Sequence, residues 1–352
     1  MALDETVLGT FIERAVGELS ASFSAPLILI GDRLGLYKAM AGAGPLTPAA
    51  LAETTGTNER YVREWLCNQA ASGYVTYDPA GATFTLTDEA AFCLADEDSP
   101  VFLPGAYQLV SSMMHDGPKI SSAFRSGQGV GWHEHHEELY SGTERFFRPG
   151  YNANLVSGWL PALDGVVERL TAGGMVADVG CGHGASTIIM ARNFPNSRFT
   201  GFDYHAASIE MARKRATEAG VADRVTFEIA SATDYPGGGY DLVTFFDSLH
   251  DMGDPVAAAS HVLESLRRDG TFLLVEPYAG DNIEDNLNPV GRIFYAASTM
   301  VCIPASLAQP CQAALGAQAG EARLRDVALT AGFTRFRRAT ETPFNLILEA
   351  RP

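Results

Sequence analysis

Cysteine is scarce in this chain, and no two cysteines stand in a C-x-x-C pair. Among 352 residues there are five: Cys67, Cys93, Cys181, Cys302 and Cys311. This usage argues against a disulfide framework and a zinc ribbon, because cysteine is sparse and no C-x-x-C pair is present. It suits a reducing compartment, so we expect a cytoplasmic protein.

Basic residues and long apolar runs are also few. Lys and Arg number 25 against 42 Asp and Glu, which gives a formal net charge of −17. Such a charge repels phosphate, whereas a nucleic-acid binder needs a basic face. No apolar run reaches the roughly 20 residues of a membrane span, and the start, Met1 to Glu5, is acidic where a secretory signal is basic. We therefore expect no nucleic-acid partner, no membrane and no export signal.

The most informative stretch that is present runs from Val176 to Thr187. A short apolar strand breaks there into three alternating glycines and then starts a helix, which is typical of a nucleotide-binding turn. A second strand, 198–203, ends in Asp203 about 20 residues later, where an acid can bind ribose hydroxyls. The G-x-G-x-x-G spacing of a dinucleotide site is missing.

The elements that follow alternate between strands and helices. Strands are predicted over 225–231, 241–247 and 271–276, and helices over 208–218 and 255–267. This alternation predicts an α/β domain with a parallel sheet covered on both faces. The chain closes with a helix over 324–331 and two strands, 333–340 and 344–350, that form an antiparallel hairpin.

This series of motifs resembles the class I S-adenosylmethionine (SAM)-dependent methyltransferases. The resemblance implies a Rossmann-like domain over 171–352, with seven strands in the order 3-2-1-4-5-7-6 and the last strand antiparallel. It implies SAM as cofactor and S-adenosylhomocysteine as product. The acid with which the family usually contacts the adenine is either replaced here by Ser231 or displaced to Asp234. The cofactor-binding residues carried over are Asp178, Gly180, Cys181, Gly182, Gly184, Asp203, Tyr204, Ser231, Ala232, Phe246 and Asp247.

The N-terminal part, residues 1–98, has a different pattern. Gly35 to Met40 is expected to end a helix, and two further helices, 48–54 and one capped by Asn58, precede a hairpin over 74–86. This arrangement predicts a winged helix-turn-helix. The usual role of such a domain is DNA binding, and a SAM-binding regulator is the alternative function. The third helix, however, carries equal numbers of acidic and basic residues and is neutral: Glu59, Arg60, Arg63 and Glu64.

A winged helix before a domain of this kind is similar to the small-molecule O-methyltransferases. It looks closest to a bacterial winged-helix methyltransferase family, some members of which have been likened to glycine and sarcosine N-methyltransferases. The resemblance implies a homodimer formed through the N-terminal domain. An apolar helix stripe fits that surface, although burial within one subunit explains it nearly as well: Val7, Phe11, Ile12 and Val16.

Methyl transfer requires no metal, but it benefits from a base of near-neutral pKa, which directs attention to histidine. His133, His135 and His136 cluster in the segment 99–170 that connects the two domains. Three interpretations compete: an active-site wall in which His133 or His136 acts as a base or orients the acceptor, a structural cluster, and a metal site formed by His133 with His136 or Glu137. We favour the wall; the metal site would instead indicate a metal-dependent hydrolase or lyase.

A second histidine follows the fourth strand, where ligands gather in parallel sheets. His250 is expected to act near the transferred methyl, with Glu276, at the end of the fifth strand, orienting it or receiving a proton; capping and adenine stacking are the alternatives. A long insertion over about 278–320 is expected to form a lid, within which Arg292 could bind an acceptor carboxylate or form a surface ion pair. Its apolar middle favours a small organic acceptor, methylated at O or N by in-line displacement.

Overall fold

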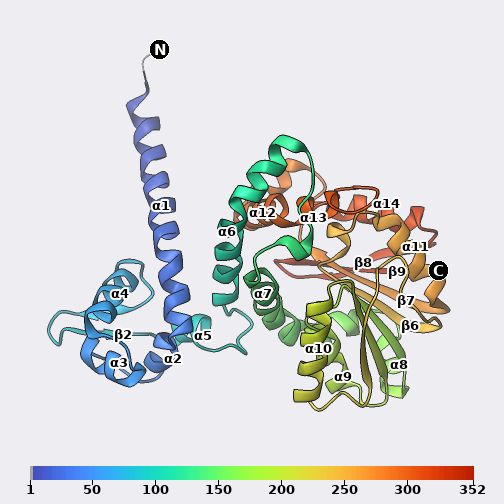
Figure 1. Cartoon of the computed structure of the whole chain (residues 1–352), viewed down its shortest axis with the longest axis horizontal. Helices are drawn as coiled ribbons and strands as arrows, with labels where there is room; N and C mark the ends of the chain where they lie inside the picture. The colour runs from blue at the N-terminus through green and yellow to red at the C-terminus, as the bar shows by residue number, and fades with distance from the viewer. Residues whose placement is uncertain (1–2) are drawn as a thin grey trace. The chain divides into compact units, whose positions relative to one another are not determined.

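The computed structural model describes residues 3–352, and they form two compact units that divide after Ser111 (Figure 1). The division falls inside the predicted connecting segment 99–170. Most of that segment therefore belongs to the C-terminal unit, and helix α6, Pro104–Ser126, crosses the boundary.

The N-terminal unit contains the predicted helices and hairpin. Its core consists of fully buried side chains that include Tyr37, Leu51 and Leu66. Thr47 and Asn58 cap α3 and α4 by accepting backbone N–H groups, as their sequence positions predict. The elements are α1 Glu5–Arg33, α2 Leu36–Met40, α3 Pro48–Thr55, α4 Glu59–Ala71, β1 Thr76–Asp78, β2 Thr83–Thr85 and α5 Asp88–Leu94.

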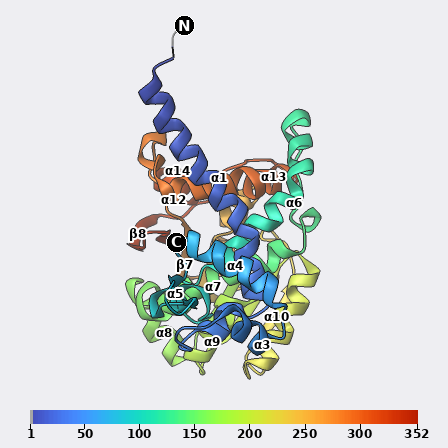
Figure 2. The ribbon, with the colours of Figure 1, turned by 90° about the vertical axis from the view of Figure 1, so that its left-hand side faces the viewer.

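Helix α1 extends well beyond the short helices of this unit (Figures 1 and 2). Its buried residues lie only in the C-terminal third, between Ser24 and Gly31. The sequence predicts that residues 35–40 end a longer helix, but they form a separate short helix, α2. Gly35 adopts φ +67°, a left-handed conformation that separates α1 from α2.

The C-terminal unit is built on a seven-stranded sheet in the order β5-β4-β3-β6-β7-β9-β8. The first five of these strands are parallel, and β9 is antiparallel to both β7 and β8. This is the predicted order 3-2-1-4-5-7-6, so the fold class is confirmed. The strands are β3 Met175–Val179, β4 Arg198–Asp203, β5 Val225–Ile229, β6 Tyr240–Phe246, β7 Leu266–Pro277, β8 Arg335–Glu341 and β9 Asn345–Arg351.

Helices cover both faces of the sheet (Figure 1). One apolar core joins the sheet to α8 Val166–Ala172, α9 Ala185–Asn193 and α10 Ala206–Glu218. The other core joins it to α11 Pro255–Ser265 and α14 Gly320–Thr330. Strand β7 begins at Leu266, earlier than predicted, because the chain is already extended there with ψ 154°.

Two further helical segments flank the carboxyl edge of the sheet. The first, before β3, contains η1 Trp132–Glu134, α7 Glu138–Asn154, η2 Leu155–Trp159 and η3 Leu160–Ala162. The second is the predicted lid, with η5 Ile283–Asn286, α12 Pro289–Ala297, the π-helical η6 Ser298–Cys302 and α13 Ile303–Leu307. The run 289–307 is long and apolar enough to cross a membrane by composition, but Phe294 and Cys302 are buried in a core with Ala317. We therefore interpret it as a core helix.

Candidate active site

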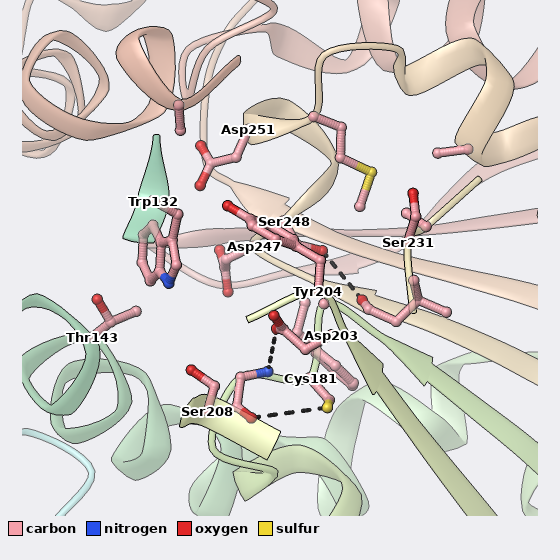
Figure 3. A pocket seen from close by; sticks show the side chains of 18 of the residues that line it. Trp132, Thr143, Cys181, Asp203, Tyr204, Ser208, Ser231, Asp247, Ser248 and Asp251 are labelled. Carbon is pink, nitrogen blue, oxygen red and sulfur yellow. Dashed lines mark hydrogen bonds between the residues drawn. The ribbon is translucent and has the colours of Figure 1, made fainter. Parts of the chain in front are cut away.

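A cavity of about 430 Å³ opens at the carboxyl ends of β3, β4 and β6. Its walls come from the glycine turn after β3, from α7 and from the lid around Ala305 and Gln309 (Figure 3). Parallel sheets bind ligands at this edge, because loops from neighbouring strands diverge there. The cavity therefore lies where the sequence places the nucleoside site.

The glycine turn holds the first acid of the site. Gly180 adopts φ +74, and a Cβ there would lie 2.9 Å from the side chain of Ser248, so the turn needs glycine. The Gly182 N–H donates to Asp203 Oδ2 at 2.9 Å, and the His205 N–H donates to Oδ1 at 2.8 Å. Burial raises the pKa of Asp203, whereas these two hydrogen bonds oppose the rise. The carboxylate is thus fixed at the cavity wall.

Asp178 lies behind the turn rather than in the cavity. It is buried and accepts hydrogen bonds from the hydroxyls of Ser186 at 2.7 Å, Thr187 at 2.6 Å and Thr244 at 3.0 Å. Burial raises its pKa, and the three hydroxyls limit the rise. Asp178 therefore ties the end of β3 to α9 and β6 and orients the turn.

Asp247 follows β6 and also lines the cavity. Its Oδ2 accepts a hydrogen bond from the Tyr151 hydroxyl, and its Oδ1 accepts one from the Asn345 amide, both at 3.0 Å. Burial, together with the nearby charge of Glu276, raises its pKa to about 8. The residue has φ +50, which an L-amino acid rarely adopts, so its place in the wall carries backbone strain.

One face of α7 forms a further wall. Its cavity residues follow the spacing that brings side chains onto one side of a helix: Tyr140, Thr143, Glu144, Phe147 and Tyr151. The ring of Trp132 joins this wall, with its centroid 5.6 Å from that of Tyr140. Aromatic rings therefore make up much of one side of the cavity.

His250 lies behind the cavity, between two carboxylates. Its Nδ1 hydrogen-bonds to Glu276 Oε2, and its Nε2 lies 3.1 Å from Asp251 Oδ1. Burial lowers the pKa of His250, but the charges of Glu276 and Asp251 outweigh it and raise the pKa well above the usual value. Asp251 lines the cavity, whereas His250 and Glu276 do not. The raised pKa favours the protonated form of His250, and Asp251 is the member of this cluster that lines the cavity.

Comparison with known proteins agrees with this architecture. Residues 170–324 match the sequence family of a methyltransferase domain, and residues 22–96 match the Rv2258c-like winged HTH domain. The chain therefore combines an N-terminal winged-helix domain with a methyltransferase domain. The matches confirm the predicted family and, with it, SAM as the cofactor of this class.

Individual relatives show how much of the chain is similar and at what sequence identity. The chain is 39% identical over 118 residues to 27-O-demethylrifamycin SV methyltransferase of Amycolatopsis mediterranei, which covers 32% of the chain and 43% of that protein. It spans about two fifths of the length of the first two curated relatives it matches. The fold is similar to mitomycin 7-O-methyltransferase MmcR, with TM-score 0.71, 20% identity and coverage of 99% and 100%. It is also similar to human N-acetylserotonin methyltransferase in complex with SAM, with TM-score 0.69, 17% identity and 97% coverage of both chains.

Most of the cofactor-binding residues that the sequence predicts lie together. Those that line the cavity are Gly180, Cys181, Gly182, Asp203, Tyr204, Ser231, Ala232, Phe246 and Asp247. Asp178 lies behind it, and Gly184 is the N-cap of α9. Burial raises the pKa of the Cys181 thiol well above its usual value, so this side chain stays protonated.

The histidine cluster does not reach the cavity. His133 is exposed, and His136 stacks on His115 with a centroid distance of 4.3 Å. His135 is buried and hydrogen-bonds through Nδ1 to Asp116 Oδ2 at 2.8 Å. The prediction that these histidines form the wall is wrong in geometry: Asp116 turns His135 inward, and the neighbouring Trp132 faces the cavity instead.

The cavity lining is strongly acidic, which the sequence alone did not reveal. No Lys or Arg occurs among the described residues that line it, and Arg292 lies elsewhere, on α12. Burial lowers the pKa of His183 to about 4, so this lining residue is neutral. Glu144 is paired with Arg215 at 2.6 Å. The acids that line the cavity are Glu144, Asp203, Asp247, Asp251 and Asp254.

Proposed function

We propose that this protein transfers the methyl group of SAM to an oxygen or nitrogen atom of a small organic acceptor. The observation that carries the proposal is the carboxylate of Asp203, held by the Gly182 amide at the wall of a cavity within a methyltransferase domain. An acid at this position accepts hydrogen bonds from the ribose hydroxyls of a bound nucleoside.

The other cavity residues support a consistent cofactor orientation. Tyr204, Ser231 and Ala232 would flank the adenine, and Asp247 would accept a hydrogen bond from the ammonium group of the methionine portion. SAM carries a sulfonium and an ammonium against one carboxylate, so an acidic lining favours it electrostatically. The sulfonium already activates the methyl group, so the protein must mainly align the acceptor and exclude water.

The acceptor would lie beside Trp132, Asp251 and Gln309, which line the cavity. Asp251 would receive or orient the acceptor proton, with His250 and Glu276 positioned behind it. With no Lys or Arg in the described lining, an acceptor carboxylate would have no cationic partner. The lining therefore favours neutral or cationic acceptors, such as phenols and amines. We further propose that the chain acts as a homodimer associated through α1.

Calorimetric titration with SAM and S-adenosylhomocysteine tests the cofactor assignment. Wild type should bind both, and Asp203→Ala should weaken binding at least tenfold, because hydrogen bonds to a charged group contribute about 1.5–3 kcal/mol. Asp223→Ala is the matched control, since its carboxylate is exposed and pairs with the adjacent Arg224. Failure of wild type to bind either compound, or equal binding by Asp203→Ala, would refute the proposal.

A further inference from the structure

His183, in the glycine turn, lines the cavity with one ring nitrogen that has no partner. It stands between Gly182 and Gly184, and its Nδ1 is buried without a hydrogen-bond partner among the described residues. Since Nδ1 is closed off by protein, the ring meets the cavity through its opposite, Nε2 edge. An unpaired N–H on Nδ1 would be costly, so the proton of the neutral ring belongs on Nε2. His183 therefore offers an N–H donor at the cavity wall.

The surroundings of His183 keep its ring uncharged. Burial, together with the nearby charge of Arg215, lowers the pKa of His183 to about 4, although Glu144 opposes this shift. Arg215 itself is directed to Glu144, with 2.6 Å between Nη1 and Oε1, and Arg148 Nε lies 3.6 Å from the same oxygen. The guanidinium that acts on His183 is thus paired with an acid of the lining. The donor at the cavity wall is a neutral imidazole.

An acidic lining leaves one group of SAM without an electrostatic partner. Acids attract the sulfonium and the ammonium, but they repel the carboxylate of the methionine portion. Asp203 is already assigned to the ribose and Asp247 to the ammonium. No Lys or Arg occurs in the part of the lining that the structure describes, so neutral donors must take the carboxylate. Without donors, an enclosed carboxylate would oppose binding.

The hydroxyls around the glycine turn cannot supply these donors, because they already donate within the protein. Their acceptors are backbone carbonyls or the carboxylates of Asp178 and Asp247, at 2.7 to 3.4 Å. The hydroxyls belong to Thr143, Tyr151, Ser186 and Ser248. The N–H of His183 has no such acceptor among the described residues. The first N–H groups of α9, at Ala185 and Ser186, lie next to it in the lining and lack acceptors within the helix.

We propose that the Nε2–H of His183 donates a hydrogen bond to the carboxylate of the methionine portion of SAM. The inference rests on the proposed function, because it assigns one contact within the cofactor site. The carboxylate and the ammonium of SAM share one carbon, so their partners must lie at the same end of the cavity. Tyr151, which donates to Asp247, lies about two turns after Glu144 on the cavity face of α7. Glu144 in turn acts on His183.

A pair of ligands that differ only in the carboxylate tests this contact. S-adenosylhomocysteine carries the group, whereas decarboxylated S-adenosylhomocysteine keeps the adenosine, the sulfur and the amine. In calorimetry, wild type should bind S-adenosylhomocysteine at least tenfold more tightly, because hydrogen bonds to a charged group are the stronger ones. His183→Leu keeps the bulk but has no donor, so this preference should fall about tenfold, through weaker binding of S-adenosylhomocysteine alone. His183→Gln, whose amide N–H has a similar reach, should retain the preference.

Two further variants define what the result means. Asp203→Ala should weaken both compounds alike, because both carry the ribose. His133→Leu is the matched control and should behave as wild type, since His133 is exposed and lies outside the cavity lining.

The outcomes separate this proposal from the proposed function. Binding of the decarboxylated compound verifies that each variant is folded. Equal weakening of both compounds by His183→Leu would overturn the proposal, because the histidine would then act on the adenosine or on the fold. An unchanged preference in His183→Leu would overturn it as well. Failure of wild type to bind either compound would instead refute the proposed function.

Discussion

At the scale of single residues, Asp247 departs most from ordinary protein chemistry. A non-glycine residue at positive φ costs about 1–3 kcal/mol and persists only where its surroundings enforce it. Here Tyr151 and Asn345 enforce it by donating to the two carboxylate oxygens. Burial holds the pKa near 8, so the unliganded site keeps a proton that a cationic ligand would displace. Strain and an elevated pKa at one residue are typical of a functional position.

This pKa predicts a pH-dependent affinity for SAM. Below about pH 8 Asp247 must lose its proton before it can pair with the ammonium of SAM, so affinity should fall by up to tenfold for each pH unit. Asp247→Asn should bind more weakly at high pH and show a flatter profile, measured by calorimetry between about pH 6 and pH 9. Glu276, His250, Asp251 and Tyr151 surround the group, and all four side chains are retained in the variant.

The raised pKa of Asp247 also makes the free energy of unfolding of the unliganded protein depend on pH. The native state binds the proton of Asp247 more tightly than the unfolded chain, so its contribution to the unfolding free energy declines as pH rises from about 4 to 8. Asp247→Asn should remove that decline, whereas the exposed Asp223→Asn should not. For the affinity measurement, a wild-type affinity for SAM that stays constant between about pH 6 and pH 9 would contradict the proposed pairing of Asp247 with the ammonium group.

At the scale of elements, the sequence predicted the sheet because its signals are local. Gly180, Gly182 and Asp203 mark a turn and the end of the neighbouring strand, and hydrophobic runs mark the other strands.

The cavity wall on α7 could not be predicted from the sequence. Tyr140, Thr143 and Phe147 have helical spacing, but their residue types do not show whether that helix face lines a cavity or packs in a core. The histidine cluster is conspicuous in the sequence, but its composition does not show which way the side chains point. The contact of His135 with Asp116, a residue on another element, determines that direction. Cys302 approaches His250 through a π-helical turn that no sequence period indicates.

Docking of the loop 127–131 onto the lid gives a prediction at this scale. A Cβ on Gly129 would lie 2.0 Å from the backbone nitrogen of Ala308, and Val130 N–H donates to the Pro304 carbonyl at 3.0 Å. Gly129→Ala should therefore separate the loop from α13, displace Trp132 and lower the unfolding free energy by about 1–3 kcal/mol. Urea denaturation measures this loss.

Gly17→Ala provides the control for that substitution. Gly17 is exposed in α1 with nothing within 4 Å of an added Cβ, so alanine should leave stability unchanged or raise it by up to about 1 kcal/mol. Should Gly129→Ala unfold at the same urea concentration as wild type, the loop is not held by this contact and Trp132 is not a fixed wall.

At the scale of the whole molecule, a strong negative charge coexists with a long apolar helix face. The net charge of −17 disfavours nucleic acid, and the exposed pairs Arg60–Glu64 and Arg63–Glu59 cancel the charges on α4. These observations weigh against a DNA-binding regulator. The first two thirds of α1, in contrast, leave a row of large apolar side chains in solvent: Val7, Phe11, Ile12, Val16, Leu19 and Phe23. Soluble chains rarely expose a row of this size without a partner.

A second copy of the chain is the partner that we propose for this face. If α1 mediates association, light scattering should give twice the 37.6 kDa chain mass, and Phe11→Glu should give the single mass, because a buried unpaired carboxylate opposes the contact. Tyr61→Glu on α4 is the matched control, since Tyr61 is 80% exposed but lies outside the row. Phe11→Glu should retain S-adenosylhomocysteine binding, because the cavity residues all belong to the C-terminal unit. A wild-type chain that remains monomeric at high concentration, or a Phe11→Glu chain that remains dimeric, would exclude association through α1.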